Sequence, residues 1–249
     1  MATNPGLERP AVQDAANAQY RALSTAALVG LFFGLFSWVV LLGWWGWFVP
    51  ILGIIFSGLG LWRVARHADA MIGRKAALVG LWLSVVFAVA APTHWFGYRR
   101  MVRREATKFA MAWFEYLRND KPLEIHQLSL PPKHRVPLDD TLVEFYREDT
   151  ELLKEARFYS EHPLVSRLLS LGPNAEARYY TTVEQGRIRQ ADALYQVFSV
   201  TYDDDGQRKT FFVGISMDRM PLGNGKYSWR VIYTDHGFVP PEFRGKEEG

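Results

Sequence analysis

Cysteine is absent from this chain of 249 residues. Disulfide bonds, thiolate nucleophiles and cysteine-ligated metal sites are therefore excluded, and the redox compartment stays open. The chain also lacks a paired His-x-x-x-His, a phosphate-binding loop, a Gly-x-Ser-x-Gly elbow and an EF-hand loop. We therefore assign no catalytic residue, no metal ligand and no cofactor from the sequence.

Charge is missing from two long stretches. Residues 22–62 contain no Asp, Glu, Lys, Arg or His, and residues 76–98 contain only His94. A helix needs about 20 apolar residues to cross about 30 Å of hydrocarbon, so the first stretch suits two spans and the second suits one. We predict a membrane α-helical, three-span bundle with spans at about 24–42, 46–63 and 76–97.

Aromatic and basic residues flank these spans. Tryptophan prefers the level of the lipid headgroups, and arginine is attracted by anionic headgroups. The expected interface residues are Trp44, Trp45, Trp47, Trp95, Arg99, Arg100, Arg103 and Arg104. The lipid bilayer is thus the first predicted partner.

Small residues recur inside the spans and predict close helix packing. The expected packing positions are Gly30, Gly34, Gly53, Gly58 and Gly80. Gly30-x-x-x-Gly34 is typical of dimerising spans, and a homo-oligomer stays open, but we favour packing among the chain's own spans. The hexamer at 26–31 recurs at 76–81, which predicts that the first and third spans run in the same direction.

The orientation rests on a narrow difference in basic residues. Arg9, Arg21 and the linker 63–75 place six Lys/Arg on one side, and the segment after the third span places five on the other. The positive-inside rule then favours a cytoplasmic N-terminus and an extracytoplasmic C-terminal domain. The rival is a two-crossing arrangement with one re-entrant segment and a cytoplasmic C-terminal domain. No ionisable residue lies in the middle of a span, which disfavours a transporter or pump.

The glycine and arginine pattern of residues 22–97 resembles a short bacterial membrane module, the domain of unknown function 4190. The resemblance rests on Pro50, Gly53, Gly58, Gly60, Arg63, Arg66, Gly73 and Gly80. The tryptophan-rich first turn and Trp82 depart from the family's plainer pattern. The resemblance implies an envelope protein of a bacterium, and implies no activity. With the three spans, we expect a multi-pass protein of the inner membrane.

The charge of the chain is unevenly divided. Residues 1–104 carry ten Lys/Arg and three Asp/Glu, whereas residues 105–249 carry nineteen and twenty-three. Proteins that bind nucleic acids need a clustered basic face on the folded domain. We therefore predict no nucleic-acid partner, and leave open an unknown protein or small ligand.

The remaining chain predicts a soluble α+β domain at 99–236, between the membrane module at 22–98 and a C-terminal tail at 237–249. A polar tail at 1–21 is expected to be disordered. Helical periodicity covers 99–118 and about 140–160, and Pro163 fits the first turn of a short helix. Alternating strands at 176–187, 193–203, 208–219 and 226–235 are separated by hairpin turns at 203–206 and 222–225. Helices should therefore pack on a four-stranded antiparallel sheet.

This order of elements is similar to the cone-shaped nuclear transport factor 2-like fold, which often holds a pocket between its sheet and helix. Cystatin-like and other α+β sheets stay open. The candidate pocket residues are Trp113, Tyr146, Tyr195 and Trp229, although core packing explains the same pattern and is favoured. An acid–base dyad of His126 and Asp139 stays open, but nothing in the spacing of the two residues favours this pair.

Two function classes follow. The first is a non-catalytic binding or assembly module anchored in the bacterial cell envelope. The second is a membrane-bound enzyme that uses a sheet–helix pocket on a small apolar substrate. Titratable side chains that converge in a closed pocket would favour the enzyme.

Overall fold

The structure is a computed structural model and describes residues 22–66, 71–188 and 191–236. It divides into two compact units, Met1–Tyr98 and Arg99–Gly249, which are described separately. The tails expected at 1–21 and 237–249 lie outside the described residues.

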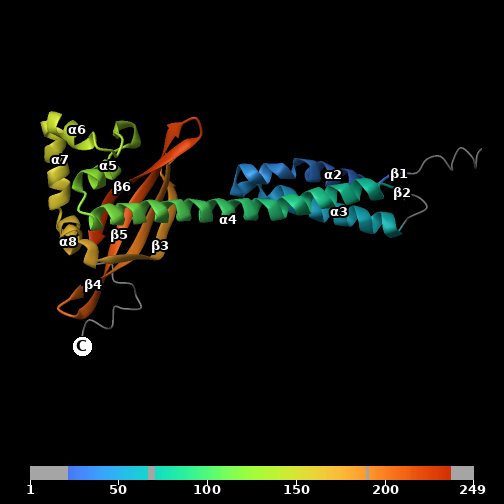
Figure 1. Ribbon diagram of the computed structural model, residues 1–249. Coiled ribbons are helices and arrows are strands. Elements are labelled where there is room, and N and C mark those ends of the chain that lie inside the picture. Colours follow the sequence, from blue (N-terminus) through green and yellow to red (C-terminus); the bar gives the residue numbers. More distant parts are fainter. Residues whose placement is uncertain (1–21, 67–70, 189–190, 237–249) are drawn as a thin grey trace, which may run out of the picture. The chain divides into compact units, whose positions relative to one another are not determined.

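The first unit contains three apolar helical segments. The helix α2 (Thr25–Phe36) continues into the 3₁₀ helix η1 (Ser37–Leu42), and η2 (Trp44–Trp47) leads into α3 (Phe48–Arg66). The third segment is the first half of α4 (Arg74–Arg118), which continues into the second unit (Figure 1). All three helices are long and apolar enough to cross a membrane, and their positions agree with the three predicted spans.

Large apolar side chains lie on the outside of this unit and small ones on the inside. Phe32, Leu42 and Trp82 are 58%, 67% and 67% exposed. Ala27 and Ala77, in contrast, are almost fully buried. The distribution is inverted relative to a water-soluble protein, in which large apolar side chains are the most often buried.

The interior is small because three glycines bring the backbones into contact. A Cβ atom on Gly34 would lie 2.5 Å from the carbonyl oxygen of Gly80, and one on Gly80 would lie 2.7 Å from that of Gly30. The paired glycines 30 and 80 occupy equivalent positions of the repeated hexamer. The short strands β1 (Ala22–Leu23) and β2 (Met71–Ile72), directly before the two helices, pair in parallel. The first and third segments therefore start in the same direction, as the repeat predicts.

Serines complete the contact between the helices. A Cβ atom on Gly53 would collide with the hydroxyl of Ser84, which itself donates to the carbonyl of Gly80 at 2.8 Å. Gly58 differs from the expectation, because it is exposed and no described atom lies within 4 Å of its Cβ position. Gly60 makes the close contact instead, with the backbone of Ala27. The sequence identifies the glycine-rich stretch of α3 but does not fix which face turns inward.

The second unit is a helical layer followed by a meander. Its helices are the end of α4, α5 (Pro122–Ser129), η3 (Pro132–His134), α6 (Leu142–Glu148), α7 (Thr150–Glu161), α8 (Pro163–Leu171) and η4 (Gly172–Asn174). Its strands are β3 (Glu176–Ile188), β4 (Ala191–Asp204), β5 (Gln207–Gly223) and β6 (Lys226–His236). They form an antiparallel sheet in the order β3-β4-β5-β6, which confirms the predicted four-stranded sheet.

Both predicted hairpin turns have the conformation that their sequences favour. Asp205 and Gly206 have φ values of 52° and 80°, and Asn224 and Gly225 have 51° and 71°. Two successive positive φ angles characterise the type I′ turn, whose twist matches that of paired strands.

The helix predicted at 140–160 is wrong as a single element. Asp149 is extended, with φ −104° and ψ 93°, and its carboxylate accepts hydrogen bonds from the amides of Glu151 and Leu152. This N-cap starts α7 and separates it from α6, because it satisfies amides that a continuous helix would bond internally. The structure adds the short helix α5 before it, with Pro122 in the first turn.

The core of the second unit lies between α4 and one face of the sheet. Phe114 of α4 contacts Phe198 of β4 with ring centroids 5.2 Å apart. Trp113 and Phe198 are fully buried. Gln196, on the same sheet face, donates to the hydroxyl of Thr107 at 3.2 Å. The sheet face that carries Phe198 and Gln196 is therefore the one that α4 covers (Figure 1).

We predict that Gly34→Ala lowers the free energy of unfolding by about 1–3 kcal/mol, because overpacking of a filled contact forces the backbones apart. Gly58→Ala is the matched control, since its Cβ position is open and alanine favours the helix. Titration of the full chain in detergent micelles with sodium dodecyl sulfate, followed by circular dichroism, measures both. Equal destabilisation of the two variants would contradict the packing.

Candidate functional site

A cavity of about 250 Å³ lies where the end of α4, α8 and the start of β3 meet. Its apolar lining comes from Met111, Phe114, Leu117, Leu168, Ala175, Ala177 and Val200. Gly172 and the charged residues Glu115, Arg118 and Glu176 complete the lining. The volume is somewhat below the range of about 300–1,000 Å³ typical of ligand pockets, and suits one apolar group with a charged neighbour.

The charged side chains at the cavity pair with one another and with nearby arginines. Arg118 lies 4.0 Å from Glu115, and Glu176 accepts from Arg178 at 2.8 Å. The hydrogen bond and charge of Arg178 lower the pKa of Glu176, and Arg208 and Arg118 contribute less. Glu176 is therefore ionised at neutral pH. A general acid or base works best with a pKa near the operating pH, so this carboxylate suits binding better than proton transfer.

The structure does not bring the four candidate pocket residues together at this cavity. Trp113 is fully buried against Phe114, with ring centroids 5.1 Å apart, and Trp229 is 7% exposed in β6. Tyr195 points to the opposite face of the sheet from Gln196, because neighbouring strand residues alternate. There its hydroxyl donates to the carboxylate of Asp235 at 2.9 Å.

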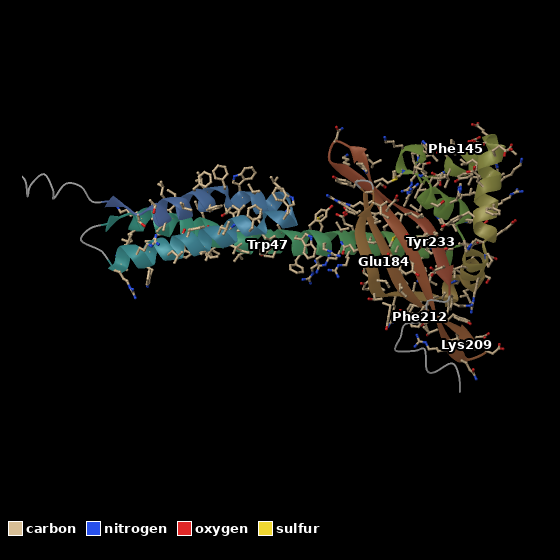
Figure 2. The ribbon with its side chains drawn as sticks, turned by 180° about the vertical axis from the view of Figure 1, so that it is seen from behind. Trp47, Phe145, Glu184, Lys209, Phe212 and Tyr233 are labelled. Atoms are coloured by element: carbon tan, nitrogen blue, oxygen red, sulfur yellow. The ribbon has the colours of Figure 1, made fainter. Side chains whose placement is uncertain are left out.

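Burial and the neighbouring carboxylate of Asp235 raise the pKa of Tyr195. Its ring stacks on that of Tyr233 at 6.3 Å. Figure 2 views the sheet from this side, with Glu184, Phe212 and Tyr233 labelled. Tyr195 is thus part of a second aromatic layer, separate from the helix-covered core.

Tyr146 belongs to a buried polar cluster between α5 and α6. Its hydroxyl lies 2.7 Å from Nδ1 of His126 and accepts from Nε2 of Gln127 at 2.9 Å. The side-chain oxygen of Gln127 in turn accepts from the backbone amide of Val136 at 3.1 Å. All three side chains are almost fully buried, and each hydrogen bond ties the two helices or the loop between them together. The cluster is a structural brace.

Burial explains the titration of this cluster. It lowers the pKa of His126, and the charge of Glu155 opposes the shift by a smaller amount. Burial also raises the pKa of Tyr146 to about 12, against a smaller opposite effect of the Gln127 hydrogen bond. The neutral forms of both side chains are therefore the ones that the folded state stabilises. Asp139 accepts instead from the amide and hydroxyl of Thr141, so the structure does not assemble the dyad with His126.

Arg135 holds two parts of the second unit together, a role that the sequence pattern did not reveal. Its guanidinium donates to the carbonyl of Leu128 at 2.9 Å and to that of Trp229 at 2.6 Å, and its Nε donates to the carbonyl of Leu130 at 3.1 Å. Burial, and to a smaller extent the charge of Arg230, lower its pKa to about 10 against the opposing charge of Asp218. Arg135 thus joins the end of α5 to β6. A lone arginine in a loop gives no periodic signal, so only the fold identifies this role.

The expected interface residues are exposed where their side chains are described. Trp45, Trp47 and Trp95 are 60%, 37% and 51% exposed. In the second unit Arg100, Arg103 and Arg104 are exposed, and Arg99 is half-buried and donates to the carbonyl of Gln185 at 3.2 Å. The side chain of Trp44 lies outside what the structure describes.

The described residues contain no group of three or more His, Asp or Glu that could hold a metal ion. No family model matches the chain, and neither a curated protein nor a solved structure matches it.

We predict that acid loosens the α5–α6 brace through His126. Because the folded state lowers its pKa, the unfolded state binds more protons as the pH falls below about 6.5. Stability from this group is therefore full above that pH and is lost below it. Hydrogen exchange of the α5 and α6 amides, corrected for intrinsic rates, should show falling protection from pH 7.5 to pH 5.5.

His126→Gln should remove this pH dependence, whatever its effect on protection at pH 7.5. His134→Asn, at an exposed position in η3, should retain it. If the amide protection of His126→Gln fell with pH as steeply as that of the unchanged chain, the assignment of the pH dependence to His126 would be refuted.

Proposed function

We propose that this chain is a membrane-anchored, non-catalytic binding or assembly module of the bacterial cell envelope. The anchor is the first unit. Its outward side chains such as Leu42 and Trp82, both 67% exposed, would each forgo about 1.5–3 kcal/mol of burial in water. Hydrocarbon removes this cost, and the inward glycines already hold the bundle together without a large core.

The resemblance to the domain of unknown function 4190 module supports the inner membrane of a bacterium as the location. The Lys/Arg residues that flank the spans, six on the side of the N-terminus and five on the side of the second unit, favour an extracytoplasmic second unit. Bulges in the sheet support the cone-shaped, nuclear transport factor 2-like form of that unit. They interrupt the β3–β4 register near Tyr179 and Thr182 and the β5–β6 register near Ser216, and a bulge bends its strand.

The observation that carries the binding role is the lining of the cavity between α4, α8 and β3. Its floor is apolar, while Glu115, Arg118 and Glu176 hold opposite charges at its rim. Such a site can hold an apolar group and orient a polar one beside it. Two placements weigh against the enzymatic alternative. Glu176 at the cavity is held ionised, and His126, which does not line the cavity, is held in the α5–α6 brace.

We predict that cysteine labelling will place the second unit outside the cytoplasm. The chain is free of cysteine, so single substitutions give one reactive thiol each. An impermeant maleimide should label Lys154→Cys, exposed on α7, in intact spheroplasts. Lys75→Cys, exposed at the start of α4, should react only after lysis.

The reversed pattern would place the second unit in the cytoplasm. Recovery of the full chain in the soluble fraction, with both thiols reactive, would contradict the membrane anchor itself.

We predict that a photo-crosslinker at the cavity captures a discrete partner or ligand. p-Benzoylphenylalanine in place of Met111, which lines the cavity, should give an adduct of defined mass in cells. The same group in place of Phe158, 80% exposed on α7, is the matched control and should give none of that mass. Ala175→Trp should abolish the adduct by filling the cavity. The same adduct at both positions, or none at Met111, would contradict the cavity as the binding site.

A further inference from the structure

One end of the second unit gathers the part of α4 that begins at Arg99 and the ends of all four strands. Ile188 of β3 pairs with Ala191 of β4, and Gly223 of β5 pairs with Lys226 of β6. Between them, Asp192 pairs with Arg219 across β4 and β5. The β5–β6 turn and the β3 terminus therefore lie at the same end of the sheet.

Direct contacts place residues 99–105 of α4 at this end. Arg99 donates to the carbonyl of Gln185 at 3.2 Å, and Gln185 donates back to the carbonyl of Arg99 at 3.2 Å. One turn and a half later, the carboxylate of Glu105 lies 2.9 Å from the guanidinium of Arg219. In the sequence, Arg99 follows the third apolar segment directly.

The charge of this end is strongly basic. It holds the basic side chains Arg99, Arg100, Arg103, Arg104, Arg187, Arg219 and Lys226. Three of the acidic side chains near them are paired: Glu105 with Arg219, Asp192 with Arg219 at 3.7 Å and Arg187 at 3.6 Å, and Asp218 with Arg230 at 2.8 Å, while Glu184 is exposed on β3. Residues 105–249 as a whole carry more acidic than basic residues. The positive charge is therefore local to this end.

Apolar and aromatic side chains stand at the tips beside these bases. Ile188 is 63% exposed, Leu222 in the β5–β6 turn region is 44% exposed, and Tyr227 is 50% exposed. The guanidinium of Arg219 lies 4.1 Å from the ring centroid of Tyr227, which holds the aromatic side chain beside the basic cluster. Basic residues next to exposed aliphatic and tyrosyl side chains are typical of surfaces that rest on lipid headgroups.

We propose that this end of the second unit is a lipid-docking surface that binds the phosphate headgroups of anionic lipids. Arg100, Arg103, Arg104, Arg187 and Lys226 contact the headgroups, and the tips at Ile188 and Leu222 enter the interface. The inference rests on the proposed membrane anchor and extends the expected headgroup contact from residues 99–104 of α4 to the sheet. Nucleic acid would also match the charge, but the aliphatic tips and the direct attachment to an apolar segment favour lipid.

The test uses the full chain with one nitroxide-labelled cysteine, at Ile188→Cys or Leu222→Cys, in lipid nanodiscs. One set of discs is phosphatidylcholine alone and the other contains phosphatidylglycerol. Collision with oxygen and with a nickel chelate reports the depth of the label. Phosphatidylglycerol should shift both labels from water-like access to the lower nickel access of the headgroup region, and high salt should reverse the shift.

Two controls separate docking from a general effect of charge. A label at Lys154→Cys on α7 should keep water-like access in both discs. Arg187→Glu combined with Lys226→Glu should abolish the shift at Leu222, whereas Lys133→Glu, at an exposed position in η3, should leave it unchanged. An unchanged thermal midpoint of the double variant shows that it has folded.

Water-like access at both labels in low-salt phosphatidylglycerol discs would overturn the docking surface and leave the anchor intact. A chain that does not enter discs at all would overturn the anchor, and the docking surface with it. The two failures are therefore distinguishable.

Discussion

The close approach of helix backbones in the first unit is the constraint on which its organisation depends. For the membrane anchor that we propose, hydrocarbon would offer no hydrophobic gain for burying a leucine between helices, so association would rely on packing and hydrogen bonds. Gly30, Gly34 and Gly80 remove the side chains that would hold the backbones apart, and Ser84 fills the space at Gly53. Because the interior is used up by small residues, the bulky phenylalanines, leucines and tryptophans have only the outer surface to occupy. The same choice of residues thus sets both the packing and the apolar exterior.

The second unit is built by the opposite rule, with its bulky side chains inside and several buried polar groups held by hydrogen bonds. Gln196, Gln127 and Arg135 each satisfy backbone or side-chain partners in the interior. A buried polar group without a partner costs about 1–3 kcal/mol, so these bonds also fix which helix meets which strand. The helical layer is short and broken, and Arg135 compensates by joining α5 to β6 through three carbonyls.

Features that depend on one short segment could be predicted from the residues of that segment alone. Uncharged length predicts the spans, and Asp205-Gly206 and Asn224-Gly225 predict the turns, because lipid solvation and positive φ angles act within a few residues. Features decided by distant partners were missed. The inward face of α3, at Gly60 rather than Gly58, depends on Ala27 of α2. The cavity could not be predicted for the same reason, because it is lined mainly by residues without a distinctive pattern from three parts of the chain. The break at Asp149 is different, since its N-cap acts within three residues, but the helical periodicity of 140–160 continues across it and hides it.

The basic residues gather in a few parts of the chain, which the net charge of +3 does not show. The positive-inside rule counts basic residues near the ends of spans, and Arg99 to Arg104 are counted on the side of the second unit. In the folded unit, however, Arg99 donates to the carbonyl of Gln185 in β3, so it serves the fold of that unit as well as flanking the apolar segment. An arginine that bonds within a folded domain has a role that the positive-inside rule does not count.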